Sequence, residues 1–504
     1  MKSALKNLAL SKFPIAILAA GMLFSVAGMA ADEVTARAIK LYEQHHYEEA
    51  SQILRPEMAG MESSRQASSS LVLGMIHLGN AKLYRELYQT ALIIELDYLK
   101  QLSKQKTGTS SRMVEFYLGK ALLETGKTAE AASYLQRFAD RAGVKQNLRS
   151  IATAELGLAY SRQKLTGKAS QTWLSLDSKN SEIKAALAAA YAAAGVNEHK
   201  PVTMADAVMS DAKAQHNTPD AGTLRNLLRA YSQTGATDKA LDLLSTNEFK
   251  NASYIEDLGA SKSIGFYDLS ILEDMARANL DAAVVQLERA SGDSTTANSA
   301  NFFLADAYLQ QGKAEIALRT MNVFISQTQM PAQYRDVARI RHAGALYKVG
   351  QRTEAAAIWQ TMVDTPAVTP AVLAEVVETC ALAKADCAKF EKSALAVLEK
   401  GDGKKYFPLS AALGKYYLLQ KDFPRAVMYM EAGRDKANKN KIEVNDPAML
   451  IDLAEAYYRN KNFSESLEIY FELGKQYPVV RQIQEAIQGI YSVEQKSAGD
   501  VKIY

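Results

Sequence analysis

The sequence predicts an all-helical fold, an extended solenoid in which antiparallel helix pairs stack against one another. Glycine and proline are scarce, with 27 and 11 residues among 504, whereas alanine, leucine, lysine, glutamate and glutamine dominate long stretches. This composition favours helices. We find no convincing segment in which apolar and polar residues alternate as they do in a strand. A recurring spacing of small and large residues then favours helix pairs over other helical folds.

The recurring pattern has four marks. A small residue is followed by a large residue three positions later, by a second small residue twelve positions after the first, and by a large residue four positions beyond that. One copy consists of Gly119, Leu122, Ala131 and Leu135. Residues three or four apart share one helix face. Two helices approach closely only where small residues meet, so the small marks belong at the crossing. The first mark recurs at Gly157, Ala305, Ala343, Gly414 and Ala454, and in one further copy the larger Leu228 stands in its place.

Turn residues agree with this reading. Gly126 and Gly312 fall where the first helix of a pair must end, which suits a residue that adopts positive φ without strain. Asp422 stands just before a second helix and can cap its free N–H groups, and Pro424 is tolerated in the first helical turn.

The pattern resembles the tetratricopeptide repeat, a helix-turn-helix unit of 34 residues. The resemblance implies a right-handed superhelical solenoid whose first helices line a concave groove. Seven copies are recognisable. A weaker copy starts near Ala38, and Leu73–Leu78 and the segment 181–195 look like degenerate first helices. One expected boundary at 291–298 divides an N-terminal solenoid (31–290) from a C-terminal one (299–494) with a closing helix at 479–494 and a tail at 495–504. One continuous superhelix is the alternative.

The first thirty residues have a different character. An apolar run at 13–28 leads into small residues and follows three lysines: Lys2, Lys6 and Lys12. This is the pattern of a secretory signal peptide over 1–30, cut after Ala30. A retained membrane anchor is the alternative, because the apolar run is near the lower limit for spanning a bilayer.

Without those three lysines, the mature chain has 56 basic and 56 acidic residues and a net charge near zero. A nucleic-acid partner is not expected, since it would demand a basic field. We find no second long apolar segment, so the mature chain is not expected to span a membrane. We expect a periplasmic protein that reaches the outer membrane, if at all, through its partners.

The two cysteines, Cys380 and Cys387, are seven positions apart. In an oxidising compartment this pair predicts a disulfide, with free thiols as the alternative. A zinc site would need two further ligands, and no histidine lies close in sequence. We expect no metal, no cofactor and no catalytic residue. The chain has many carboxylates, so the sequence does not exclude a pair of them that acts in catalysis. The dipeptide Glu465–Ser466 is typical of lytic transglycosylases, but here it is expected inside a second helix.

The resemblance also identifies residues that would line the groove. These candidates for partner binding are Phe116, Lys120, Arg162, Arg225, Arg229, Phe302, Lys348, Lys415, Tyr458 and Arg459. Seven of them are cations, against three carboxylates at equivalent positions: Glu124, Asp306 and Glu455. This bias favours an extended acidic peptide or an anionic polysaccharide, with aromatic rings adding contact area. The alternative is an ordinary solvated polar face.

Together these observations predict a non-catalytic periplasmic scaffold or adaptor for protein–protein interactions. It would serve an envelope assembly or a system that exports a surface polymer, either polysaccharide or pilus. The alternative functions are an accessory protein that binds polysaccharide or peptidoglycan, and a cell-wall-modifying enzyme.

Overall fold

The structure is a computed structural model that describes residues 33–61, 63–104, 110–196, 199–247, 249, 255–256, 266–267, 270–326, 332–365, 368–400, 407–434 and 446–497. The predicted signal peptide lies outside these residues. The chain forms two compact units. Unit 1 contains the chain up to Lys82 and residues 282–476, and unit 2 contains residues 83–281 and the chain from Tyr477 onwards.

These units differ from the sequential halves that the repeat pattern suggested. The chain passes from one unit to the other three times, inside the long helices α4 (Ser63–Lys104) and α14 (Ile271–Ser291) and after Gln476. The predicted boundary at 291–298 lies instead within unit 1. There the Thr296 hydroxyl donates a buried hydrogen bond of 2.6 Å to the Ala290 carbonyl oxygen, which closes a tight turn after α14.

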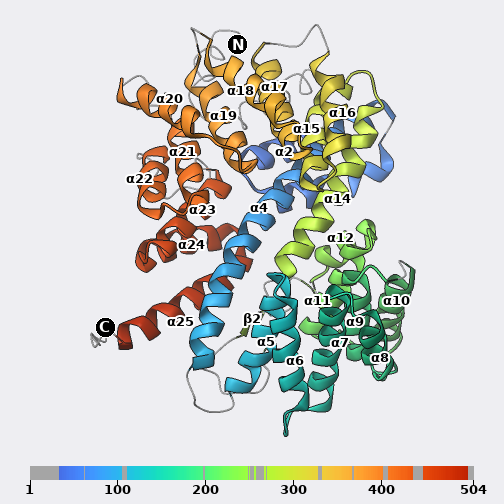
Figure 1. The fold of residues 1–504 in the computed structure, drawn as a ribbon. Coiled ribbons are helices and arrows are strands. Elements are labelled where there is room, and N and C mark those ends of the chain that lie inside the picture. Colours follow the sequence, from blue (N-terminus) through green and yellow to red (C-terminus); the bar gives the residue numbers. More distant parts are fainter. Residues whose placement is uncertain are drawn as a thin grey trace. The chain divides into compact units, whose positions relative to one another are not determined.

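Unit 2 contains four helix pairs in chain order (Figure 1). They are α5 (Ser110–Glu124) with α6 (Thr128–Asp140), α7 (Gln146–Arg162) with α8 (Thr166–Leu174), α9 (Ser181–Ala193) with α10 (His199–Ala214), and α11 (Ala221–Gln233) with α12 (Thr237–Ser245). A two-residue antiparallel ladder joins β1 (Ile255–Glu256) to β2 (Phe266–Tyr267). The expected closing helix is α25 (Arg481–Ser497), preceded by a 3-10 turn, η3 (Pro478–Val480).

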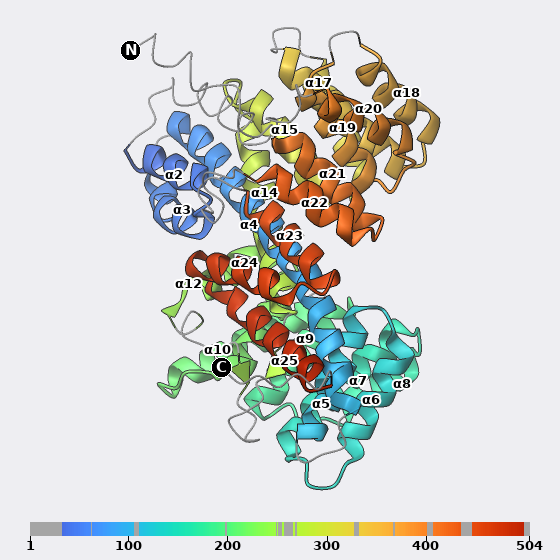
Figure 2. The same cartoon turned by 90° about the vertical axis from the view of Figure 1, so that its left-hand side faces the viewer.

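Unit 1 opens with α2 (Glu33–Glu43), α3 (Tyr47–Leu54) and the 3-10 turn η1 (Glu57–Gly60), and Figure 2 shows α2 and α3 beside the start of α4. Five pairs follow: α15 (Ala297–Gln310) with α16 (Ala314–Ile325), α17 (Ala332–Lys348) with α18 (Arg352–Val363), α19 (Pro370–Leu382) with α20 (Ala388–Glu399), α21 (Phe407–Leu419) with α22 (Phe423–Gly433), and α23 (Pro447–Arg459) with α24 (Phe463–Gln476).

The small marks lie at the helix crossings, as predicted. A Cβ atom placed on Gly157 would come within 2.3 Å of Trp173 Nε1, and one on Gly414 within 2.3 Å of Met430 Cγ. Both contacts join the first helix of a pair to its second helix. The large residue sixteen positions after the small mark therefore fills the space that the glycine leaves.

The turn inside each pair has a fixed backbone conformation. Seven residues after the first small mark, the chain adopts positive φ, with Gly126 at 76° and Gly312 at 76°. Lysine takes the same position in other pairs, with φ between 56° and 64°, at Lys164, Lys384, Lys421 and Lys461. This shared position identifies α19 with α20 as a further pair that the sequence pattern missed.

Helix α4 is the element that the sequence analysis described least well. Only its segment Leu73–Leu78 was expected, as a degenerate first helix, whereas the helix has 42 residues. Every residue from Ser69 to Leu78 is buried, so this segment of the helix is enclosed on all sides. In unit 1 its neighbours include α2, through a 3.0 Å hydrogen bond between Thr35 Oγ1 and Ser69 Oγ. Among the described helices, none combines the length and apolar character needed to cross a membrane.

Candidate functional site

The three predicted groove aromatics belong to the core. Phe116, Phe302 and Tyr458 are 3%, 2% and 6% exposed. The ring of Phe116 packs on Phe138, and that of Phe302 on Phe324, with centroids 5.3 and 5.1 Å apart. Phe116 and Phe302, three residues before the small mark, thus face the second helix of the same pair, and Tyr458, four residues after its mark, packs on Phe463 of the second helix. The expectation that these rings offer contact area to a partner was wrong.

In unit 2, Arg229 is the centre of a buried ionic cluster. Its guanidinium on α11 lies 2.9 Å from Glu124 on α5, 3.5 Å from Glu155 on α7 and 3.4 Å from Asp274 on α14. Lys120 on α5 approaches Glu155 at 3.7 Å. We call these five residues the Arg229 cluster. Each is largely buried, so the two cations are engaged by carboxylates of the same unit.

Burial also changes the acidity of the cluster. It raises the pKa of Asp274 to about 6, against the opposing effect of Arg229. Tyr88 on α4 donates to Glu124 at 3.4 Å, and burial raises the pKa of this tyrosine as well. Arg225, one turn before Arg229, is 7% exposed. Three of the four cations predicted for the groove of this unit, Lys120, Arg225 and Arg229, are therefore largely buried.

Unit 1 repeats the arrangement with other residues. Lys415 on α21 pairs with Asp452 on α23, and Arg341 on α17 pairs with Glu375 on α19 at 2.7 Å. Burial, followed by the charge of Glu375, raises the pKa of nearby Glu378 to about 7. Each pair joins the first helices of successive repeats, 37 and 34 positions apart in the chain. Such pairs fix the stacking of the repeats and leave less charge for a partner.

The remaining predicted cations are more accessible. Arg162 and Lys348 are exposed, although Arg162 donates to the Leu123 carbonyl oxygen at 2.8 Å. Arg459 is half-buried and lies 3.5 Å from Glu455 on its own helix. The structure thus separates the seven predicted cations into four that are largely buried and three that retain access to solvent.

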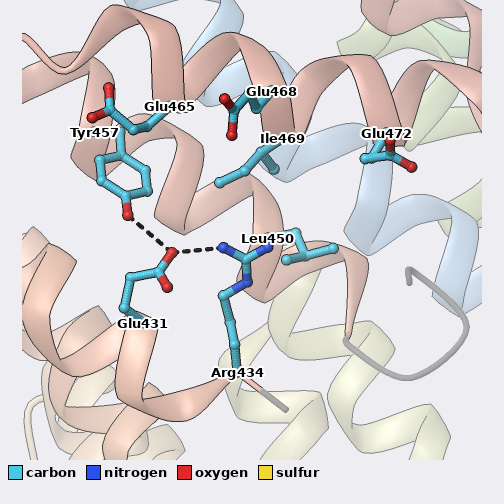
Figure 3. A pocket seen from close by; sticks show the side chains of 8 residues that line it. All are labelled: Glu431, Arg434, Leu450, Tyr457, Glu465, Glu468, Ile469 and Glu472. Carbon is cyan, nitrogen blue, oxygen red and sulfur yellow. Dashed lines mark hydrogen bonds and ion pairs between the residues drawn. The ribbon is translucent and has the colours of Figure 1, made fainter. Parts of the chain in front are cut away.

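A small pocket of about 60 Å³ opens on another face of unit 1, between α22, α23 and α24 (Figure 3). We call it the α24 pocket. Its charged lining consists of four glutamates and one arginine, and its other lining residues are two apolar side chains and a tyrosine. The lining residues are Glu431, Arg434, Leu450, Tyr457, Glu465, Glu468, Ile469 and Glu472.

Two hydrogen bonds order one wall of the α24 pocket. Glu431 on α22 accepts from Tyr457 at 2.9 Å and from Arg434 at 2.6 Å (Figure 3). On the other side, Glu465, Glu468 and Glu472 follow one another along α24. Lys475 pairs with Glu472 at 2.7 Å and offsets part of this charge. The pocket keeps an excess of negative charge.

The α24 pocket was not predicted from the sequence, although three of its glutamates form a recognisable pattern. Glu465, Glu468 and Glu472 are three and four positions apart, so they share one helix face. Phe471, on the same side as Glu468, is 49% exposed. An acidic stripe with an exposed aromatic ring on a second helix is a better indication of a contact surface than the positions assumed to line the groove.

The structure joins Cys380 and Cys387 in a disulfide. The bond connects the last turn of α19 to the residue that precedes α20. Among the described residues, no group of three or more His, Cys, Asp or Glu side chains could hold a metal ion.

The sequence matches no protein-family model and no curated protein. Among the solved structures that are similar to this chain are three at low identity. The P58(IPK) TPR domain is 15% identical, covering 70% of this chain and 98% of its own, with a TM-score of 0.19. The APC/C hetero-tetramer Cut9-Hcn1 is 11% identical over 89% and 95% (TM-score 0.27), and yeast Tom70 is 11% identical over 92% and 95% (TM-score 0.30).

The contacts inside the helix pairs themselves define the repeating unit of the fold. Trp173 Nε1 donates to the Ala154 carbonyl oxygen at 3.0 Å, and Trp359 Nε1 donates to that of Ile340 at 3.1 Å. Both bonds join a second helix to the residue three positions before the small mark on its first helix. The spacing, the glycine crossings and the left-handed turns recur from one antiparallel helix pair to the next.

Proposed function

We propose that the protein is a non-catalytic scaffold that binds other proteins, and that the α24 pocket receives a basic side chain of a partner. The observation that carries the proposal is the lining of this pocket, in which four glutamates face one arginine. An excess of carboxylates at a partly exposed site attracts a cation and disfavours an anion.

The shape of the pocket favours lysine or arginine over a bare ion. Leu450 and Ile469 are buried apolar residues in the lining. A long basic side chain can lay its methylene groups on such a surface and keep its charge among Glu465, Glu468 and Glu472. The exposed ring of Phe471 adds apolar contact area beside it.

Under this proposal the expected partner is basic, whereas the sequence predicted an acidic one. An acidic peptide or anionic polysaccharide was predicted from seven cations, but Lys120, Arg225, Arg229 and Lys415 are largely buried. An acidic ligand would have to displace their carboxylate partners or bind through the other three cations alone. At the α24 pocket a basic segment would compete with Lys475 for Glu472 and with Arg434 for Glu431, whereas Glu465 and Glu468 form no ion pair among the described residues.

The cellular context is part of the same proposal. The pattern at 1–30 supports export, and the neutral charge of the mature chain gives no reason to expect nucleic acid. We place the scaffold in the periplasm, where it would hold components of an envelope assembly or a surface-polymer export system.

Co-purification after cross-linking tests the proposal. The charge-reversing double variant Glu465→Lys/Glu468→Lys should lose the protein partners that the wild type retains, by tenfold or more. A matched control is Glu130→Lys/Glu315→Lys, which reverses two exposed glutamates on other second helices, α6 and α16. Equal retention of partners by the wild type and both variants would contradict the proposal.

A further inference from the structure

The Arg229 cluster draws its members from four helices. Arg229 belongs to α11, Glu124 and Lys120 to α5, Glu155 to α7 and Asp274 to α14. The guanidinium contacts all three carboxylates within 3.5 Å. The cluster therefore joins four helices of unit 2 at one point.

The charges in direct contact do not balance. Three carboxylates meet two cations, and the side chains are between 4% and 12% exposed. Glu155 Oε2 is a buried oxygen without a hydrogen-bond partner among the described residues. A buried negative charge is costly unless it is fully paired. Two further charges lie nearby, namely Arg225 on α11 and Glu273 on α14, which pairs with Arg277 at 3.4 Å.

We propose that the Arg229 cluster is a proton-sensitive clasp: on mild acidification Asp274 takes up one proton, which removes the excess negative charge and holds α14 more firmly on α11. The proposal is independent of the α24 pocket.

The hydrogen bonds around Asp274 suit both protonation states. When the carboxyl is ionised, its Oδ1 accepts from Ser232 Oγ at 3.0 Å and from Gln233 Nε2 at 3.1 Å. The Ser232 hydroxyl also lies 3.3 Å from the Arg229 carbonyl oxygen. After protonation the Asp274 O–H can donate to Ser232 Oγ, while the Ser232 hydroxyl donates to the Arg229 carbonyl oxygen. Neither state leaves Ser232 or Asp274 without a partner.

Burial sets the pH range. It raises the pKa of Asp274 from 3.8 to about 6, Arg229 opposes this rise, and Glu273 adds to it. A carboxyl whose pKa is higher in the folded than in the unfolded chain adds stability at low pH, which is lost as pH rises through the folded value. The folding equilibrium constant should therefore increase by up to about tenfold for each pH unit below about 6.

Chemical unfolding of the full-length mature protein at pH 7.5 and pH 5, with hydrogen exchange of residues 271–281, tests the clasp. The wild type should be more stable at pH 5, and the protection factors of this segment, which compare each exchange rate with the intrinsic rate at the same pH, should be higher there. Asp274→Asn, which mimics the neutral carboxyl, should show similarly high protection factors at both pH values. The control Asp238→Asn changes an exposed carboxylate on α12 and should keep the pH response of the wild type.

A second variant keeps the test decisive if Asp274→Asn fails to fold. Glu155→Gln removes one negative charge from the cluster, so the midpoint of the pH response should move to lower pH. The proposal is overturned if the protection factors of residues 271–281 are independent of pH in the wild type, or if Glu155→Gln leaves the midpoint of their pH response unchanged.

Discussion

Tyr417 on α21 donates a 2.5 Å hydrogen bond to Glu391 on α20, the second helix of the preceding pair. The same relationship recurs in unit 1 between Tyr457 and Glu431 at 2.9 Å, and in unit 2 between Tyr231 and Asp206 at 3.1 Å. In each case the carboxylate stands 25 or 26 positions before the tyrosine. In these three pairs a tyrosine on the first helix thus fixes the register against the previous repeat.

Replacement of this hydroxyl should loosen the stacking of neighbouring repeats. Tyr457→Phe removes the donor to Glu431 and should lower the free energy of unfolding by about 1.5–3 kcal/mol, the range for a hydrogen bond to a charged group. The measurement is equilibrium denaturation in urea. The control is Tyr429→Phe, whose ring stacks on Tyr417 and whose hydroxyl has no hydrogen bond among the described residues. Equal losses in both variants would argue against a register role.

The helix crossings predict a strong asymmetry between two glycines of one repeat. Gly157→Ala should destabilise the protein by about 1–3 kcal/mol, because its new methyl group would overlap the indole ring of Trp173. Gly167→Ala on the adjacent α8 meets nothing within 4 Å and should be neutral or stabilising by up to about 1 kcal/mol. Thermal unfolding of both variants checks the pair, and a loss at Gly167 that matched the loss at Gly157 would contradict the crossing geometry.

The lysines with positive φ lower the stability of the fold, because an L-residue adopts a left-handed backbone conformation only at a cost in free energy that glycine does not have. Lys164 has a φ of 62° at the position that Gly126 occupies in the preceding repeat. Lys164→Gly should stabilise the protein by about 0.5–1 kcal/mol, since left-handed backbone costs an L-residue about 1–2 kcal/mol and glycine loses part of that gain in the unfolded chain.

The converse change provides the control for the turn. Gly126 has open space around it, so Gly126→Ala tests the backbone alone and should destabilise by about 1 kcal/mol. Urea denaturation measures both variants, and a loss of stability in Lys164→Gly would refute this account of the turn.

The disulfide makes a separate prediction. Reduction of Cys380–Cys387 should lower the free energy of unfolding by about 2 kcal/mol, as expected for closure of a short loop. Calorimetry with and without dithiothreitol measures this effect. The double variant Cys380→Ala/Cys387→Ala should not respond to the reductant, and a wild type that is equally stable in both conditions would show that the bond contributes nothing.

The parts of this fold that were predictable depend on local sterics. The spacing of Gly157, Ala169 and Trp173 determines how one helix crosses its partner, and it can be read from a single repeat. The ionic pairs between repeats were missed because each charge was assigned to solvent from its own repeat. A signal existed in the opposite charges of Lys120 and Glu155, 35 positions apart, which lie on successive first helices.

The grouping of the chain into units could not be predicted in the same way. It depends on contacts between residues far apart in sequence, such as Lys82 on α4 and Asp306 on α15, which form an ion pair at 2.8 Å. No local pattern around Lys82 indicates this partner. The α24 pocket likewise requires α22, α23 and α24 together, so only its acidic stripe was visible in the sequence.

The most direct test of the scaffold assignment places a photoreactive amino acid at one position at a time in cells. At Glu468, in the α24 pocket, irradiation should give a discrete adduct whose partner peptide contains lysine or arginine. At the exposed position Lys348, on a first helix, the same treatment should give little or none. Adducts at Lys348 to an acidic partner, with none at Glu468, would contradict the account.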